Sequence, residues 1–360
     1  MSEKMKAVIY PEPGKHEIDE ITIPDVLPGT ALVKIMATTI CGTDFKVLRG
    51  DFPGTRFPHV PGHEWSGEVV AIGEGVDELC PGDRVGAEPH VGCGRCRMCL
   101  EGTYNLCENY GRVDKGHAHI GFTTNGGLAE YAVVPSKALH RLPQNLTFGQ
   151  GAFIESVGVA LYATERVGIE AGEGVLVLGP GAIGFCATQI ARARGAGKIV
   201  LAGTRDERLQ LGEELGCDAV VNVCNEKDPV ETVRSHFDGR GADVVVELAG
   251  SSEAGQQAIL SARRGGRIVL AGSTSPGRML NVDLSQVVRG HLNIYGSVAN
   301  PKWICRRGLE MISRGYVNVD PLLTHKMPLE KFGEALEIFR ARKGGAYRVM
   351  MYPHGVENKY

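Results

Sequence analysis

Short apolar runs alternate with polar and glycine-rich turns along this chain, and the texture of the pattern changes near residue 170. Residues 5–10 and 31–37 are predicted strands, and residues 66–90 alternate short β-type runs with Pro-Gly-Asp turns. The pattern therefore predicts an irregular, β-rich first domain that extends to about residue 150.

After residue 170, short β-branched runs alternate with helix-like stretches. The predicted strands are Val175–Leu178, Ile199–Ala202, Val244–Glu247 and Ile268–Ala271, and the predicted helices between them include 187–194 and 207–215. This alternation is typical of a parallel, doubly wound sheet. A helix at 329–342 and a last strand at 346–351 are predicted to follow.

Composition narrows the class of protein. A chain of 360 residues exceeds what one hydrophobic core usually serves, so two domains are expected. The net charge of -3 predicts no attraction to nucleic acid or to an anionic membrane. The N-terminus carries no apolar run of signal-peptide length. The uncharged stretch 174–190 is interrupted by glycines and a proline and is short for a bilayer span, so we expect a cytoplasmic protein.

Four cysteines lie within fifteen residues, with the spacing C-x2-C-x2-C-x7-C: Cys93, Cys96, Cys99 and Cys107. Thiols stay reduced in the cytoplasm, so a disulfide framework is not expected. Four thiolates saturate a tetrahedral zinc ion and leave no position for substrate. We therefore predict a structural zinc; an iron-sulfur cluster is the other group that four thiolates can hold.

A second, mixed set of metal-ligand residue types lies upstream. Cys41 stands in Thr-Ile-Cys-Gly-Thr43-Asp44, and His63 and Glu64 follow about twenty residues later. A cysteine, a histidine and a carboxylate form the ligand set expected where zinc keeps an open position for catalysis. A cysteine and a histidine at this separation are weak evidence by themselves, and the surrounding motifs carry the specificity.

A glycine motif follows the predicted strand at 175–178: Gly179-Pro180-Gly181-Ala182-Ile183-Gly184. A GxGxxG sequence between an apolar strand and an apolar helix is the context required for dinucleotide binding. Gly179 would make the tight turn, Gly181 would let the backbone approach the pyrophosphate, and Gly184 would let the helix pack on the sheet. The helix N-terminus attracts the phosphate charge.

Taken in order, CGTD, GHEWSGEVVAIG, the four-cysteine segment and GPGAIG resemble the zinc-dependent medium-chain alcohol dehydrogenase superfamily over nearly the whole chain. The chain is most similar to the sorbitol (polyol) and threonine dehydrogenase branch, because Phe153-Ile154-Glu155 places glutamate where alcohol dehydrogenases carry a cysteine ligand. The resemblance implies an α/β fold with a GroES-like β-rich catalytic domain at 1–152 and 299–360. It implies a doubly wound Rossmann dinucleotide-binding domain at 153–298.

The resemblance also implies roles for site residues. Cys41 and His63 would bind a catalytic zinc directly, and Glu64 and Glu155 compete for the remaining protein position. Asp44 would orient the histidine ligand. Thr43 would pass on the proton of the substrate alcohol, whose pKa zinc lowers as it lowers that of water. Many relatives continue this relay with a histidine; here that position is Lys46, which leaves the outer relay open.

The end of the second predicted strand bears on the choice of cofactor. An NAD enzyme carries an acid there for the adenosine ribose, but this chain has Gly203, followed by Thr204 and Arg205. Losing the carboxylate removes repulsion of a 2′-phosphate, which an arginine can bind. The sequence therefore predicts a preference for NADP(H) over NAD(H). Asp206 could instead take the ribose if the loop shifts.

The remaining cofactor contacts are implied by the resemblance alone. They are Arg208, on the adenosine side, the strand end Ala271-Gly272-Ser273, and Ser297 and Val298, near the nicotinamide. Sorbitol-type enzymes carry an arginine near Ala299 and a tyrosine near Val47, and both are missing, which argues against sorbitol itself.

The sequence therefore predicts a zinc-dependent oxidoreductase with two zinc ions per chain, acting on a small secondary alcohol or ketone such as a polyol or sugar derivative. A hydroxy amino acid such as threonine is the alternative substrate. A zinc-free quinone reductase and a non-catalytic cofactor-binding protein are the alternatives outside this activity, and the zinc-ligand residues argue against both. Such families are usually homodimers or homotetramers.

Overall fold

The computed structural model describes residues 3–274 and 277–356. The chain divides into two compact units. The first comprises 1–155, 299–313 and 319–360, and the second 156–298 and 314–318. Residues 314–318 thus belong to the second unit by their contacts, whereas the sequence prediction assigned everything after residue 298 to the first domain.

The first unit is built mainly of strands. Its strands are β1 (Lys4–Ile9), β2 (Glu17–Thr22), β3 (Thr30–Ile40), β4 (Trp65–Ile72), β5 (Arg84–Ala87), β6 (His90–Val91), β7 (Ala118–His119), β8 (Tyr131–Pro135), β9 (Leu139–Arg141), β16 (Leu323–Pro328) and β17 (Arg348–Tyr352). Its α-helices are α1 (Asp44–Leu48), α2 (Arg97–Leu100), α3 (Phe148–Gly151), α10 (Lys302–Ser313) and α11 (Phe332–Ala341), and α4 (Ile154–Val167) begins in it. Short 3-10 turns occur at Tyr104–Leu106, Val113–Lys115, Ser136–Ala138, Asp320–Leu322, Leu329–Lys331 and Lys343–Gly345.

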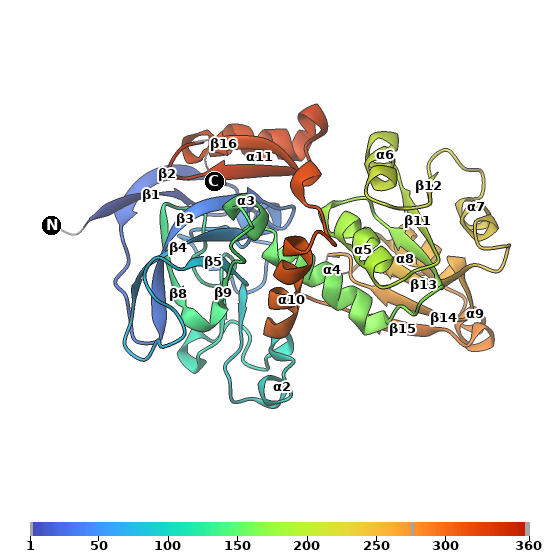
Figure 1. The fold of residues 1–360 in the computed structure, drawn as a ribbon, viewed down its shortest axis with the longest axis horizontal. Helices are drawn as coiled ribbons and strands as arrows, with labels where there is room; N and C mark the ends of the chain where they lie inside the picture. Colours follow the sequence, from blue (N-terminus) through green and yellow to red (C-terminus); the bar gives the residue numbers. More distant parts are fainter. Residues whose placement is uncertain (1–2, 275–276, 357–360) are drawn as a thin grey trace. The chain divides into compact units, whose positions relative to one another are not determined.

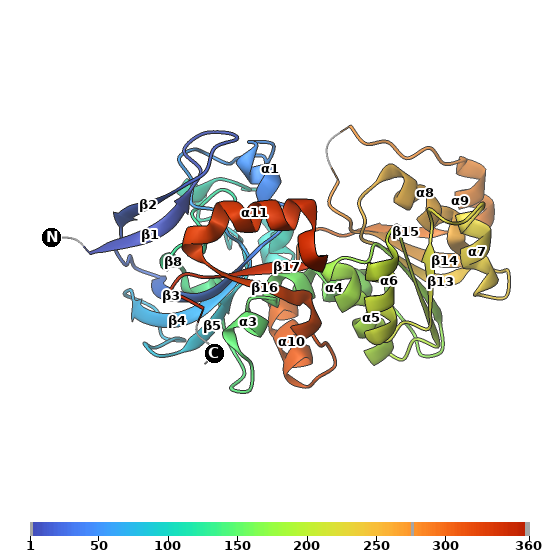
Figure 2. The ribbon, with the colours of Figure 1, turned by 90° about the horizontal axis from the view of Figure 1, so that it is seen from above.

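The main sheet of this unit has the order β16-β17-β3-β4-β5-β9, and β8 also pairs with β3. Strand β3 pairs antiparallel with β4, β8 and β17, so it holds the sheet together. Buried and half-buried positions alternate along its first part, as in a strand with one buried face, and its last four residues, 37–40, are all buried. Helix α11 lies along β16 and β17, at the C-terminal end of the chain (Figure 2).

The second unit contains a six-stranded parallel sheet, of order β12-β11-β10-β13-β14-β15, among its described residues. The strands are β10 (Gly174–Leu178), β11 (Lys198–Gly203), β12 (Ala219–Asn222), β13 (Ala242–Glu247), β14 (Ala262–Leu270) and β15 (Asn293–Gly296). The helices, labelled in Figure 1, are the rest of α4, then α5 (Ala182–Ala193), α6 (Asp206–Glu214), α7 (Pro229–Ser235), α8 (Ser252–Ser261) and α9 (Leu284–Gly290).

Every residue of β10 is buried, as expected for a central parallel strand that is covered on both faces. The strand order reverses between β10 and β13, which both pair with their neighbours in parallel. In open α/β sheets, ligands bind outside the carboxyl ends of the strands at such a reversal. The topology therefore places the predicted dinucleotide site at the end of β10.

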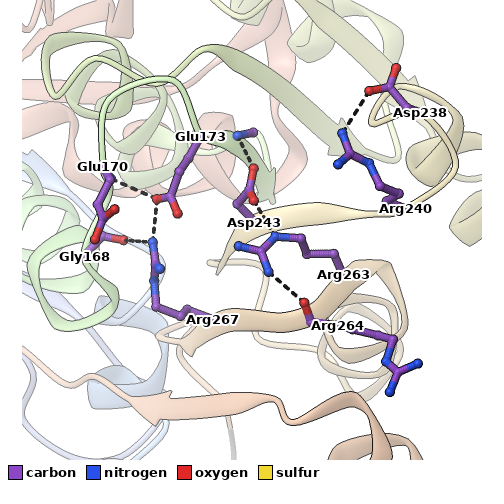
Figure 3. Close-up of polar contacts among 10 residues, drawn as sticks. Gly168, Glu170, Glu173, Asp238, Arg240, Asp243, Arg263, Arg264 and Arg267 are labelled. Carbon is purple, nitrogen blue, oxygen red and sulfur yellow. Dashed lines mark hydrogen bonds and ion pairs between the residues drawn. The ribbon is translucent and has the colours of Figure 1, made fainter.

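Ion pairs join the amino-terminal edges of neighbouring strands of this sheet (Figure 3). The guanidinium of Arg267 contacts Glu173 and donates to the carbonyl oxygens of Val167 and Gly168. Arg263 donates to Asp243, whose other carboxylate oxygen accepts the backbone N–H of Gly174 at 2.6 Å.

Among residues 3–274 and 277–356, none of the helices combines the length and the apolar content needed to cross a bilayer.

Candidate active site and metal centres

The four predicted cysteines converge in one lobe of the first unit. Their sulfur atoms all lie within 4.8 Å of one another, with Cys93 Sγ 3.9 Å from Cys99 Sγ and Cys96 Sγ 3.8 Å from Cys107 Sγ. Four sulfurs bound tetrahedrally at about 2.3 Å would lie about 3.8 Å apart. The spacing therefore fits a tetrahedral metal ion, and it is far longer than a disulfide bond of about 2.05 Å.

The backbone of the lobe also fits a thiolate-bound metal. The N–H of Arg95 and the side chain of Asn109, which donates to Cys93 Sγ at 3.2 Å, lower the pKa of Cys93 to about 6. Gly94 has a φ of +76°, a backbone conformation that is strained for any residue with a side chain. A Cβ at Gly92 would lie 2.7 Å from Cys99 Sγ, so only glycine lets the chain pass the sulfurs this closely.

The mixed ligand set also comes together. Cys41 follows β3, whereas His63 and Glu64 precede β4, and the pairing of Thr38 with Trp65 brings the two segments side by side. The ligand atoms of Cys41, His63 and Glu64 lie within 4.8 Å of one another. His63 and Glu64 are buried, and Cys41 is half-buried.

The carboxylate of Asp44 lies next to the imidazole of His63. Its Oδ2 accepts the backbone N–H of Cys41 at 2.7 Å, and its Oδ1 is 3.3 Å from His63 Nδ1. Burial opposes a charge on His63, but Asp44 and Cys41 outweigh burial and raise the pKa of the imidazole well above its ordinary value. This buried group of acids around one imidazole therefore favours a cation, which is the chemistry of a divalent metal site.

Two residues that hold Glu64 were not foreseen. The guanidinium of Arg348, in β17, donates to Glu64 Oε1 at 2.7 Å, and the hydroxyl of Thr39 donates to Oε2. The available sequence signal for Arg348 was its place at the start of the apolar run Arg-Val-Met-Met-Tyr. In the structure this arginine is only 5% exposed. Its partner lies 284 residues away, so no local pattern could identify it.

Glu155, the second candidate carboxylate, is the second residue of α4 and interacts with Glu64. The pKa of Glu155 is raised to about 7; the larger cause is burial, and the second is the charge of Glu64. The structure thus brings Cys41, His63 and Glu64 together as a compact ligand group, with Glu155 against Glu64.

The predicted proton-relay residue, Thr43, has its hydroxyl 3.9 Å from Cys41 Sγ, which places it beside the ligand group. Lys46 follows within α1, where partial burial lowers the pKa of its ammonium group.

A group of aromatic rings near His63 was also missed. The ring of Phe122 lies 4.5 Å from the His63 ring and stacks on His119, which in turn stacks on His90 at 3.8 Å. Tyr110 is hydrogen-bonded to His119 Nδ1 at 2.6 Å. Three histidines in residues 90–119, next to the four-cysteine segment, were the available sequence signal.

The predicted dinucleotide turn has the required backbone in the second unit. Gly179 has a φ of +106°, and a Cβ there would lie 2.8 Å from the backbone nitrogen of Ala249. A Cβ at Gly184 would lie 2.0 Å from the carbonyl oxygen of Gly179. A Cβ at Gly181 would meet nothing within 4 Å, so space remains where a pyrophosphate would lie, at the start of α5 with Ala182 and Ile183. The turn therefore fits a dinucleotide.

The loop after β11 carries the residues that bear on the choice of cofactor. Gly203 packs so closely on Pro180 that a Cβ would lie 2.4 Å from the proline ring. Thr204 and Arg205 are exposed, and Arg205 occupies the N-cap position of α6 without a capping hydrogen bond from its side chain. Asp206 accepts a hydrogen bond from Asn222 at 2.6 Å. Arg208 donates to the carbonyl oxygen of Pro180 at 3.2 Å, which ties α6 to the glycine turn.

The other implied cofactor residues lie at the carboxyl ends of β14 and β15, on the same edge of the sheet. The N–H groups of Ala271 and Gly272 donate to the carbonyl oxygen of Glu247, and that of Ser297 donates to Leu270. Ser273 and Val298 are exposed.

Comparisons with known proteins identify the family of this chain. Residues 27–144 match the alcohol dehydrogenase GroES-like domain family, and residues 182–313 match the zinc-binding dehydrogenase family. L-Threonine 3-dehydrogenase of Pyrococcus horikoshii is 34% identical, over 98% of this chain and 100% of that protein. Sorbitol dehydrogenase of Bacillus subtilis is 31% identical, over 98% of each chain.

Solved structures show the same fold. The crystal structure of a zinc-binding dehydrogenase from Sinorhizobium meliloti, bound to NADP, matches with a TM-score of 0.91. Its sequence is 32% identical, over 98% of this chain and 100% of that one. This likeness confirms the predicted GroES-like and Rossmann architecture. The chain belongs to the zinc-dependent medium-chain alcohol dehydrogenase superfamily, in its polyol and threonine dehydrogenase branch, and is an oxidoreductase that acts on CH–OH groups.

Proposed function

We propose that this enzyme transfers hydride between a secondary alcohol, of the polyol or sugar-derivative class, and a nicotinamide cofactor at a zinc site held by Cys41, His63 and Glu64. The main support for this proposal is that the three ligand atoms lie within 4.8 Å of one another, with Asp44 next to the histidine. Zinc bound there would supply a Lewis acid that lowers the pKa of an alcohol.

The residues of the chain have separate tasks in this proposal. Asp44 Oδ1, at 3.3 Å from His63 Nδ1, would hold the proton on that nitrogen and leave Nε2 to bind the metal. Arg348 and Thr39 hold the Glu64 carboxylate in one orientation. The hydroxyl of Thr43 accepts the proton that leaves the substrate hydroxyl and donates its own onward.

Glu155 remains the alternative direct ligand to Glu64, since the two carboxyl groups interact. Zinc content of E64Q and E155Q separates them. We expect E64Q to lose the ion of this site more readily than E155Q does, and the reverse order would assign the ligand to Glu155.

We propose that a second zinc is held by Cys93, Cys96, Cys99 and Cys107 and is structural, because four thiolates leave it no open position. Variants separate the two ions: C41S should abolish turnover and keep the four-cysteine zinc. A C41S enzyme with full activity would contradict the assignment of the catalytic site.

We propose NADP(H) as the preferred cofactor. The absence of an acid at Gly203, the exposed Arg205 and the hydrogen bond that engages Asp206 with Asn222 support this choice. The Sinorhizobium meliloti relative binds NADP. A higher kcat/KM with NAD than with NADP would refute the proposal.

L-Threonine is the second candidate substrate, because a threonine dehydrogenase is among the proteins most similar to this chain. A panel of polyols, sugar acids, sugar phosphates and threonine, each tested with both nicotinamides, decides between them. We expect the highest kcat/KM for a polyol or sugar derivative. Full activity after zinc removal would instead favour a quinone reductase, and no activity with any alcohol or ketone would favour a non-catalytic cofactor-binding protein.

We also propose that the enzyme is a homodimer or homotetramer in the cytoplasm, where its cysteines stay reduced. Strand β15 forms an edge of the six-stranded sheet, and Ile294 and Val298 are 40% and 58% exposed beside it. A second copy pairing at this edge would cover them. Light scattering on the purified protein measures the oligomeric state, and a monomer would refute this proposal.

A further inference from the structure

A third group of metal-ligand residue types lies in the first unit, apart from both metal centres described above. Glu88 directly follows β5, His140 lies in β9, and Cys305 lies in α10. Their ligand atoms lie within 4.8 Å of one another, and the three residues are 1%, 7% and 0% exposed. Three segments far apart in sequence thus bring a carboxylate, an imidazole and a thiol to one buried point.

The pairing of β5 with β9 explains how two of these residues meet. Gly86 lies opposite His140 in the ladder, so Glu88 emerges from the strand end beside the imidazole. Glu88 Oε2 is 2.7 Å from His140 Nε2, and the hydroxyl of Tyr104 donates to the other carboxylate oxygen. The thiol of Cys305 donates to Asn300 Oδ1 at 2.7 Å. Two further oxygen atoms therefore lie next to the three ligand atoms.

The carboxylate of Glu88 is buried and is hydrogen-bonded to His140 and Tyr104. A buried carboxylate needs such partners or a cation, because an uncompensated ion in the interior is costly. The Glu88 carboxylate and a Cys305 thiolate would together carry the two negative charges that match a divalent cation. A cavity of about 150 Å³ lies on the Glu88 side of the cluster and is lined in part by Glu88, Tyr104 and Cys99.

We propose that Glu88, His140 and Cys305 form a third metal site, which takes Zn²⁺ or a similar borderline divalent ion. Imidazole nitrogen, thiolate sulfur and carboxylate oxygen are zinc ligands in proteins. Binding would require that Cys305 lose its proton to solvent and that His140 carry its proton on Nδ1, so that Nε2 can face the ion. Asn300 or Tyr104 supplies the fourth donor, which closes the site and makes it structural. It would tie α10 to the sheet edge formed by β5 and β9.

Anomalous diffraction at the zinc absorption edge tests the proposal on the wild-type protein, after addition of zinc and removal of the excess. We expect a peak within bonding distance of His140 Nε2 and Cys305 Sγ, besides the peaks at the other two centres. Peaks at those two centres without a third would overturn the proposal. Because each peak is located separately, a missing peak at Cys41 and His63 would count against the proposed catalytic site and not against this one.

Zinc content of variants gives a second measurement. C305A should hold one zinc per chain less than the wild type, while C186A, which removes an equally buried cysteine in α5, should match the wild type. H140A should lose the same single equivalent. Equal zinc content in C305A and C186A would contradict the third site, and if C305A does not fold, the diffraction result on the wild type decides.

Discussion

Replacing Arg348 by methionine tests the buried ion pair that holds Glu64. The guanidinium and the carboxylate are 2.7 Å apart, and their side chains are only 6% and 1% exposed. Methionine keeps most of the apolar stem but removes the cationic partner of the buried Glu64 carboxylate. Removing one partner of such a pair costs about 3–5 kcal/mol. For a unit of this size, that cost corresponds to a melting temperature lower by about 6–20 °C.

The assay is calorimetric melting of the metal-free protein, with the double variant R348M/E64Q as the matched control. Because glutamine removes the uncompensated charge, the double variant should melt above R348M. Restoring zinc should reduce the loss in R348M, since the ion neutralises Glu64. Equal losses in the single and the double variant would refute the reasoning, because the cost would then come from packing and not from charge.

Three further predictions follow from the geometry. C107S should release the four-cysteine zinc and make residues 93–115 sensitive to protease, and a lobe that stays protected in C107S would show that the metal does not hold it. G184A should lower the melting temperature, because a Cβ at this position would lie 2.0 Å from a carbonyl oxygen. G181A, whose Cβ would meet nothing within 4 Å, should melt like the wild type and raise only the KM for the cofactor. The opposite pattern would refute this account of the turn. Burial raises the pKa of Asp243, but the hydrogen bonds from Arg263 and from the Gly174 N–H outweigh it and hold the pKa below its ordinary value of 3.8. Asp243 thus stabilises the fold above that pH, and this stabilisation is lost as the pH falls through the lower pKa of the folded state. D243N should therefore melt below the wild type at neutral pH, and the difference in melting temperature should narrow in acid. A difference that does not depend on pH would contradict the ion pair.

Local sequence determined those features that depend on neighbouring residues. Strand and helix positions in the second unit followed from the alternation of apolar runs and glycine turns, because a parallel strand and its helix are each continuous in the chain. The four cysteines also lie within fifteen residues, so their spacing alone predicted a metal, and the structure brings their sulfurs to a fitting separation. The motifs were sufficient for the family, and the comparisons confirmed it.

Only the tertiary structure decided how distant residues meet. The sequence left Glu64 and Glu155 as alternative zinc ligands. The fold brings Glu64 to Cys41 and His63, and an arginine near the other end of the chain holds it there, while Glu155 stays the alternative. Glu88, His140 and Cys305 gave no local signal, since their segments are joined by strand pairing and helix packing. Spacing along a chain fixes distances within a turn or a strand, whereas contacts across a core depend on how all the elements pack together, which no single segment encodes.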